Sequence, residues 1–132
     1  KPKIVWNRIA SVKHFAFVKD FMFIQDSMHF IIGDKLEYLC AMLNSKIIQW
    51  LLSTIIGEAA GGNAGNADNI WNLPIPKVSK CEADYITDLV KANIKNPSLE
   101  YEQKIDRAVC SWYNLDYKEL QYVMAKITLY KL

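Results

Sequence analysis

The sequence predicts an α+β fold, with a small antiparallel or mixed sheet packed on one long helix and followed by a helical C-terminal tail. Residues 1–32 contain several short runs of β-branched and aromatic residues, which are typical of strands. Residues 35–56 carry apolar side chains at three- and four-residue spacing, the pattern of an amphipathic helix, and similar spacing returns after residue 81. With 132 residues, 52% of them hydrophobic, the chain fits one globular domain.

The predicted sheet lies at the N-terminus. Its strands are expected in four short apolar runs, at residues 3–9, 13–20, 21–25 and 28–32. The last two runs are separated by the turn-like pair Asp26-Ser27. So many strands in so short a segment predict hairpin connections, and one face of the sheet can pack on the helix.

The predicted long helix has start and stop signals. Asp34 is placed as an N-cap, and Glu37 three residues later completes a capping-box pattern. Gly57 supplies a left-handed stop. A helix over residues 35–56 would be roughly 33 Å long at ~1.5 Å per residue, which is the width of a small domain.

A polar loop and a proline-rich exit follow this helix. Residues 58–69 are rich in Gly and Asn and form a loop of a length that is often functional. Trp71 is expected to return the chain to the core. Residues 73–76, Leu-Pro-Ile-Pro, are expected to be extended, as an edge strand or a brace against the helix.

The tail is predicted to be helical. One helix is expected over residues 82–96, and Ser98 is placed as the N-cap of a second. Asp116 and Glu119 form another capping-box pattern, which predicts a final short helix.

Charge and cysteine content narrow the possible functions. The net charge is only +2, but residues 1–32 carry five basic and two acidic side chains, which favours a local positive face. Three cysteines, Cys40, Cys81 and Cys110, show no pair-like spacing and are expected to be free buried thiols in a reducing, cytoplasmic compartment. The longest apolar run, IIQWLLSTII, is half of the ~20 residues that a membrane span needs. The chain begins with Lys-Pro directly before a predicted strand and has no initiator methionine, so we expect it to be part of a longer protein whose remainder holds the chemistry.

Several catalytic patterns are missing from the sequence. There is no GxxxxGK[ST] or strand-linked GxGxxG phosphate loop, and two distant histidines without Cys-x-x-Cys do not form a zinc motif. A nucleophilic pair of His29 with a cysteine is not expected. Asp106 and Arg107 are interpreted as a salt-bridged structural pair. The residues alone therefore indicate an α+β domain with a polar loop.

Four motifs resemble a known family. The chain opens with KPKIVWNRIA, and then come YLCAMLNSK, a glycine-rich gap, NLPIP and IDRAVCSWYNLDYKEL. These four motifs occur in the order found in the TaqI-like C-terminal specificity domain, which they resemble. This is the target recognition domain of bacterial DNA adenine-N6 methyltransferases and of type IIG restriction–modification enzymes. Type I specificity subunits carry related recognition domains and remain an alternative.

The resemblance implies a DNA-reading module without catalytic activity. Residues 1–76 would hold the sheet, long helix and recognition loop of a single domain, and residues 77–132 a helical tail. The partners would be double-stranded DNA and a methyltransferase domain of the same parent chain, with no membrane. That absent domain would bind S-adenosylmethionine and flip an adenine, and a nuclease domain would require Mg²⁺. This chain lacks the Asn/Asp-Pro-Pro-Tyr/Phe motif and a convincing Asp…Glu-x-Lys site.

The predicted DNA contacts form two groups. The first strand and its turn supply Trp6, Asn7, Arg8, Lys13 and His14, and the polar loop supplies Asn63, Asn66 and Asn69. Arginine reads guanine or binds phosphate, lysine suits phosphate, and asparagine pairs with adenine. For Trp6 a core position is favoured over a base-stacking role.

Two observations argue against a DNA-binding role. The polar loop carries no basic residue, unlike the corresponding gap in many family members, and Glu58 and Asp68 would repel phosphates. The near-neutral charge also suits a protein-interaction or structural domain, which is the alternative from another class. A free-standing enzyme is the third hypothesis. Asn44, Ser45 and Lys46 and the Leu-Pro-Ile-Pro segment are interpreted as structural.

Overall fold

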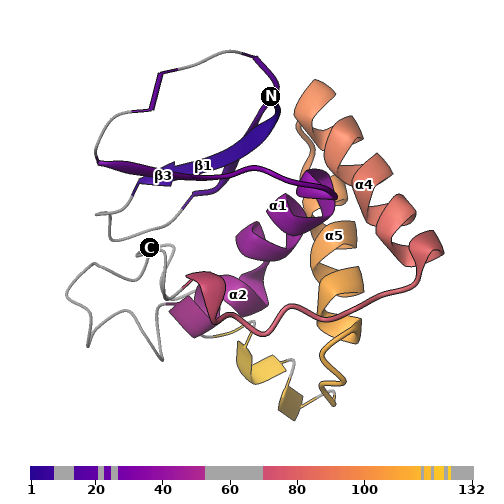
Figure 1. Ribbon diagram of the computed structural model, residues 1–132. Coiled ribbons are helices and arrows are strands. Elements are labelled where there is room, and N and C mark those ends of the chain that lie inside the picture. Colours follow the sequence, from indigo (N-terminus) through magenta and orange to yellow (C-terminus); the bar gives the residue numbers. More distant parts are fainter. Residues whose placement is uncertain are drawn as a thin grey trace.

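The computed structural model describes residues 1–7, 14–20, 23–24, 27–52, 70–116, 118–119, 121–123 and 125 (Figure 1). Its strands are β1 (Lys3–Asn7), β2 (Ala16–Val18) and β3 (Met28–Ile31). Its helices are α1 (Leu36–Asn44), α2 (Lys46–Leu51), α4 (Lys80–Lys95) and α5 (Leu99–Ser111). The predicted α+β class, with an antiparallel sheet packed on a helix, is confirmed.

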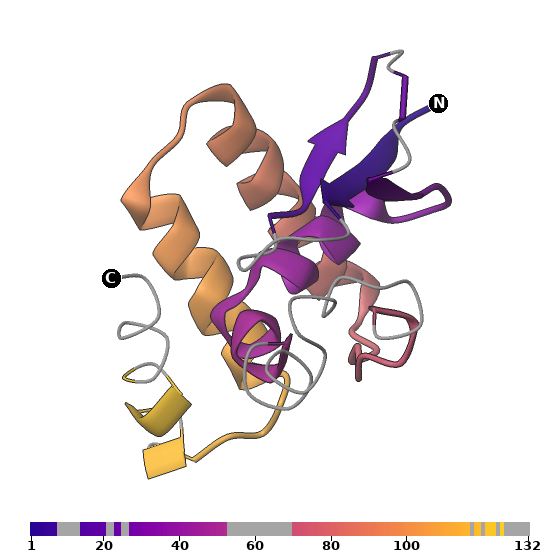
Figure 2. The same cartoon turned by 90° about the vertical axis from the view of Figure 1, so that its left-hand side faces the viewer.

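The helix α1 lies between the sheet and the helical tail (Figures 1 and 2). Leu36, Cys40 and Leu43 belong to the hydrophobic cluster shared with the sheet. Tyr38 and Met42 belong to a second cluster, shared with α4 and α5. The helix is therefore buried on two opposite faces, which makes it the centre of the fold.

The sheet has the strand order β2-β1-β3, with β1 antiparallel to both neighbours. Val5 lies opposite Ala16 on one side and Phe30 on the other. Since β2 and β3 both oppose β1, they run parallel to each other, and the chain crosses from one edge of the sheet to the other between them. The expectation of hairpin connections therefore fits the antiparallel neighbours β1 and β2 but not the step from β2 to β3. Phe23 and Ile24, which fall in a predicted strand, are not in a strand.

The predicted single helix over residues 35–56 is divided. Ser45 has an extended backbone (φ −64°, ψ 152°) that ends α1 and starts α2. Its hydroxyl donates to the Met42 carbonyl at 2.6 Å and accepts from the Ile48 N–H at 3.4 Å. Serine can satisfy helix-end groups in this way, so it competes with continuation of the helix. Residues 53–56 and Gly57 lie outside the described part of the chain.

The first helix also begins differently from the prediction. Its N-cap is Lys35, in the left-handed conformation at φ 55°, and no side chain caps this end. Gly33, with φ 148°, precedes it in a conformation that suits glycine. The left-handed residue moves the start of the helix past Asp34, so the predicted capping box of Asp34 and Glu37 does not form.

The helical tail follows the sequence prediction closely. α4 is opened by a capping box in which the Ser79 N–H donates to Glu82 Oε2 at 3.0 Å and the Glu82 N–H donates to Ser79 Oγ at 3.2 Å. Ser98 caps α5 as predicted. Asp116 and Glu119 also form their predicted reciprocal bonds, at 2.8 and 3.3 Å. The final helix is described only in part.

Trp71 does not return the chain to the core. Its side chain is 84% exposed, and the preceding Ile70, at 6% exposed, occupies the core position. Leu73 is buried on the other side of Trp71, in the same cluster as Ile70. The prediction identified the right segment but the wrong residue.

We predict that Ser45→Ala lowers the free energy of unfolding by about 1–2 kcal/mol, because a buried helix junction loses its cap. Urea denaturation at neutral pH measures this change. Ser111→Ala is the matched control, since its hydroxyl also donates to a carbonyl three residues earlier but is exposed. Equal effects of the two substitutions would contradict the role assigned to Ser45.

Candidate nucleic-acid interface

Asn44, at the end of α1, holds the backbone of the β1–β2 hairpin. The Phe15 N–H donates to Asn44 Oδ1 at 3.0 Å, and Asn44 Nδ2 donates to the Phe15 carbonyl at 2.7 Å. Nδ2 also lies 2.9 Å from the Cys40 carbonyl of its own helix. Asn44 thus satisfies both backbone groups of Phe15, as a neighbouring strand would. This bond pair fixes the hairpin one residue after His14.

Lys46, two residues further, joins α2 to the tail. Its backbone N–H donates to Asp106 Oδ1 at 3.1 Å, and its Nζ lies 3.7 Å from Asp106 Oδ2. Both side chains are largely shielded from solvent. Asp106 is therefore structural, as expected, but the ion-pair partner that the structure shows is Lys46 on another helix, not the adjacent Arg107.

Two tyrosine hydroxyls hold the Leu-Pro-Ile-Pro segment in place. Tyr113 donates to the Pro74 carbonyl at 2.8 Å, and Tyr38 donates to the Pro76 carbonyl at 2.6 Å. Burial raises the pKa of both hydroxyls, so they remain protonated donors at neutral pH. The segment is thus a brace between α1 and the residues that follow α5.

Residues from the four family-like motifs therefore meet around α1. The motif YLCAMLNSK contributes Lys46, which contacts Asp106 of the last motif, and Tyr38, which contacts Pro76 of NLPIP. Tyr113 of the last motif contacts Pro74 of NLPIP. The opening motif contributes Ile4 and Trp6, which lie in the cluster against Leu36, Cys40 and Leu43. These residues mainly build the scaffold, and apart from Trp6 they are not the predicted DNA contacts, which fall in the segments between them.

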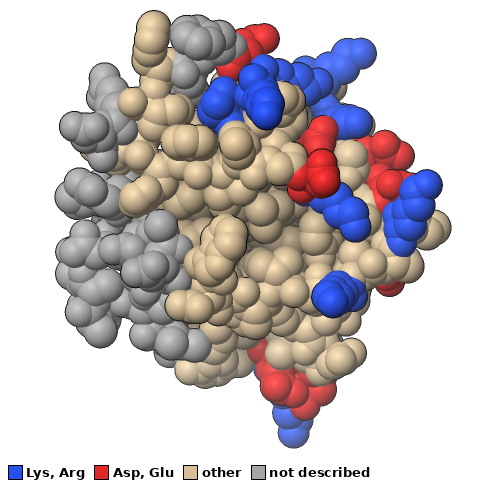
Figure 3. Space-filling view, viewed as in Figure 1, with Lys and Arg blue, Asp and Glu red and all other residues tan. Residues whose placement is uncertain are grey.

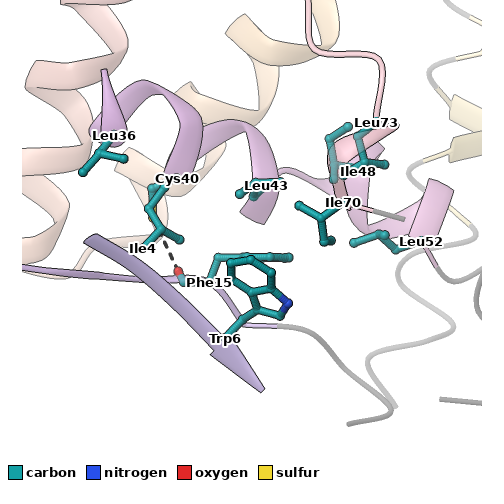
Figure 4. Packing of buried hydrophobic residues seen from close by; sticks show 10 residues of the cluster. All are labelled: Ile4, Trp6, Phe15, Leu36, Cys40, Leu43, Ile48, Leu52, Ile70 and Leu73. Atoms are coloured by element: carbon teal, nitrogen blue, oxygen red, sulfur yellow. Dashed lines mark hydrogen bonds between the residues drawn. The ribbon is translucent and has the colours of Figure 1, made fainter. Parts of the chain in front are cut away.

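The predicted contacts outside the described residues fall in two segments, 8–13 and 53–69, and the residues that flank these segments share one hydrophobic cluster. Figure 4 shows Trp6 and Phe15, from the hairpin, beside Ile70, with Leu52 close by. These four residues flank the two segments in sequence. Both segments therefore leave the scaffold from the same cluster.

Trp6 is a core residue and does not offer its ring for base stacking. It is 3% exposed, and its ring lies 5.4 Å from that of Phe15 and 5.5 Å from that of His29. Its position on the inner face follows from alternation along β1, where Ile4 faces the same cluster. Among the predicted DNA contacts, Trp6 is thus corrected to a support for the hairpin.

Asn7 and His14 are the predicted contacts that the structure exposes. The β1–β2 register, in which Val5 faces Ala16, extends to place Asn7 opposite His14 at the end of the hairpin where the two strands are connected. The other predicted contacts lie outside the described residues; they are Arg8, Lys13, Asn63, Asn66 and Asn69.

The described part of the predicted positive face lies at the other end of β1. The Lys3 ammonium donates to the carbonyls of Lys1, at 2.9 Å, and Asp20, at 3.5 Å. Figure 3 shows lysine and arginine side chains gathered along the upper edge of the molecule and few charges over its centre. The predicted phosphate contacts, Arg8 and Lys13, lie outside the described residues, so this described lysine cluster is not part of them.

Sequence reasoning missed two features near the hairpin. Trp71 is exposed, and His29 Nε2 is buried without a hydrogen-bond partner in the described structure. No local pattern distinguishes either residue, because both results depend on which neighbours occupy the core. His29 faces Trp6 from β3.

The cysteines show no sign of nucleophilic activation. Burial raises the pKa of Cys40 to about 11, with the Asn44 amide opposing this shift, and burial also raises the pKa of Cys110 to about 11. Cys81 is exposed, so the prediction of buried thiols holds only for the other two. All three are free. Neither buried thiol is a thiolate at neutral pH.

Searches of the described residues find no group of three or more His, Cys, Asp or Glu that could hold a metal ion. They also find no helix with the length and apolar character needed to cross a membrane. Comparisons of the chain with models of protein families, with curated proteins and with solved structures find no match.

We predict that Asn44→Ala lowers the free energy of unfolding by about 1–2 kcal/mol, because two backbone groups of Phe15 lose their partner. Asn44→Asp should also destabilise, since it replaces a donor to the Phe15 carbonyl with an acceptor. Urea denaturation measures both changes. Asn93→Ala, which removes one bond to the Ser98 N–H, is the control and should cost less.

A second prediction concerns alkaline pH. Because Cys40 and Cys110 keep their protons in the folded state up to about pH 11, their contribution to stability is complete below pH 9 and decreases as the pH rises. Each thiol should lower the free energy of unfolding by up to roughly 1.4 kcal/mol per pH unit above pH 9. Cys110→Ala should reduce this slope between pH 9 and 10 in denaturation curves.

The control for the alkaline experiment is Cys81→Ser, because Cys81 is exposed and lies outside the buried clusters. A slope that Cys110→Ala leaves unchanged would show that the buried thiol is not responsible.

Proposed function

We propose that this chain is the sequence-specific DNA recognition module of a bacterial restriction–modification enzyme. It would direct a methyltransferase domain of the same parent chain to its site. The observation that carries the proposal is that residues of four family-like motifs, far apart in sequence, are joined around α1, while both predicted contact segments leave one cluster. Groove reading requires contact residues that are held by a rigid scaffold, and the described ends of the two segments are held by one cluster.

In this proposal the β1–β2 hairpin reads or positions the duplex. Arg8 would take a guanine edge or a phosphate, Lys13 a phosphate, and Asn7 and His14 would add hydrogen bonds from the exposed end of the hairpin. Asn44 acts as a positioning residue, because it fixes the returning arm of the hairpin at Phe15.

The second segment would contribute amide groups. Asn63, Asn66 and Asn69 suit adenine edges, and the intervening glycines allow a close approach of the backbone to DNA. Because Glu58 and Asp68 oppose phosphate binding, this segment would read bases and add little non-specific affinity.

This chain itself would carry no catalysis. Methylation would belong to the parent chain's methyltransferase domain, with S-adenosylmethionine as its cofactor, and cleavage would need a nuclease domain with Mg²⁺. A recognition domain of a type I specificity subunit would use the same surface in the same way.

A protein-interaction domain is the second candidate function. The net charge of +2 and the sparsely charged centre of the face in Figure 3 favour it. The two candidates differ in salt dependence, because phosphate contacts make DNA affinity decrease steeply as salt concentration rises.

We predict that Arg8→Ala in the full-length protein weakens binding to its DNA site by about 1–3 kcal/mol if Arg8 reads a base. Lys13→Ala should weaken all duplexes alike and reduce the salt slope by about one. An Asn63/Asn66 double alanine should relax sequence preference. Filter-binding titrations at several salt concentrations measure these effects.

The matched control is Arg107→Ala, since Arg107 is an exposed arginine on the tail helix α5. Unchanged affinity and preference in Arg8→Ala and in the double alanine variant would overturn the assignment of the contacts. No salt-dependent binding of any duplex by the full-length protein would overturn the proposed function.

A further inference from the structure

Trp71 and Phe23 are the most exposed large hydrophobic side chains among the described residues, and Trp71 is the larger of the two. It is 84% exposed, although tryptophan is among the side chains that are most buried on average. Exposed aromatic rings of this size are typical of contact surfaces, since their burial contributes strongly to binding.

The exposure of Trp71 is imposed by its neighbours. Ile70 and Leu73 are both buried in the cluster that also holds Trp6 and Phe15. The Leu73 N–H donates to the Ile70 carbonyl at 3.2 Å, which closes a turn with Trp71 and Asn72 on its outer side. The indole cannot enter the core here unless Ile70 leaves it.

The turn is also held from the C-terminal side. Pro74 restricts the backbone, and its carbonyl accepts the Tyr113 hydroxyl at 2.8 Å. The Trp71 backbone is therefore fixed by the core on one side and by this brace on the other. A group presented in this way loses little conformational entropy when it binds.

The position of this turn connects it to the candidate interface. Figure 4 shows Ile70 beside Phe15 and Trp6, which lie near the connected end of the β1–β2 hairpin. Trp71 is thus attached directly to the cluster from which both predicted contact segments depart. Its nearest predicted contact in sequence is Asn69, two residues away.

We propose that Trp71 is an additional DNA-contacting residue, which stacks its indole on a base that has left the stack of the bound duplex or packs it on a deoxyribose. This inference rests on the proposed function. The described residues 47–52 and 70–76 contain no charged side chain, so the contact would add stacking and not phosphate neutralisation. That difference gives it a signature distinct from Arg8 and Lys13.

The test compares wild type, Trp71→Ala and Trp71→Phe in the full-length protein. The probe is a 30-bp duplex with the sequence that the wild-type protein selects from a randomised duplex pool. Trp71→Ala should raise the dissociation constant roughly 5- to 150-fold, the range expected for loss of one stacking contact. Trp71→Phe should retain most of the affinity, and the salt slope should be unchanged in both.

Leu99→Ala is the matched control, because Leu99 is 69% exposed but lies at the start of the tail helix α5. It should bind as wild type does. Thermal unfolding of Trp71→Ala should match that of wild type, since an exposed ring contributes little to the core; this separates lost contact from lost folding.

A second measurement uses quenching of tryptophan fluorescence by acrylamide. The emission of Trp71 is obtained by subtracting the spectrum of Trp71→Phe from that of wild type. The duplex should protect this emission. Protection without DNA would mean that another part of the protein covers the indole, which overturns the inference, as does wild-type affinity in Trp71→Ala. Absence of DNA binding by the wild-type protein would instead overturn the proposed function and this inference with it.

Discussion

The burial of α1 on two opposite faces is the constraint on which the rest of the structure depends. A helix of nine residues is too short to be stable alone in water. It persists here because one face packs on the sheet and the other on α4 and α5. Removing either layer would expose apolar side chains of a helix that has no side-chain cap at its N-terminus.

The C-terminal end of α1 converts this packing into fixed geometry. Hydrophobic contact is non-directional, so it brings the layers together without setting their register. The directional contacts are polar and come from consecutive residues: Asn44 to the hairpin, Ser45 to α2, and Lys46 to Asp106 on α5. Three neighbouring residues thus connect α1 to the β1–β2 hairpin, to α2 and to the helical tail.

Local signals were sufficient for much of the fold. The caps at Ser98 and Asp116 lie within a few residues of the groups that they bind, so the sequence predicts them well. The break at Ser45 was not predicted, because the apolar spacing continues through Ile47 and Leu51 and hides it. The crossover between β2 and β3 depends on strand order, which no short pattern encodes.

The candidate site was predictable in part, for a related reason. Hydrophobicity alone placed Trp71 in the core, but Ile70 and Leu73 occupy that space and leave the larger ring outside. Trp6 and Phe15 are buried by alternation along the hairpin, which makes Asn7 and His14 its exposed described residues at the connected end. The alternation of apolar residues along the sequence thus predicts the buried scaffold of the site. The exposure of Trp71 depends instead on which neighbouring side chains occupy the core.

Hydrogen–deuterium exchange of the full-length protein, with and without its selected duplex, tests the central claim most directly. The claim is that DNA binds where the two loop segments leave the common cluster. The account predicts slower exchange on DNA binding in peptides that cover residues 7–14 and 53–72, with α4 and the exposed face of α5 unchanged. Protection confined to α4 and α5, with no change in those two segments, would contradict it.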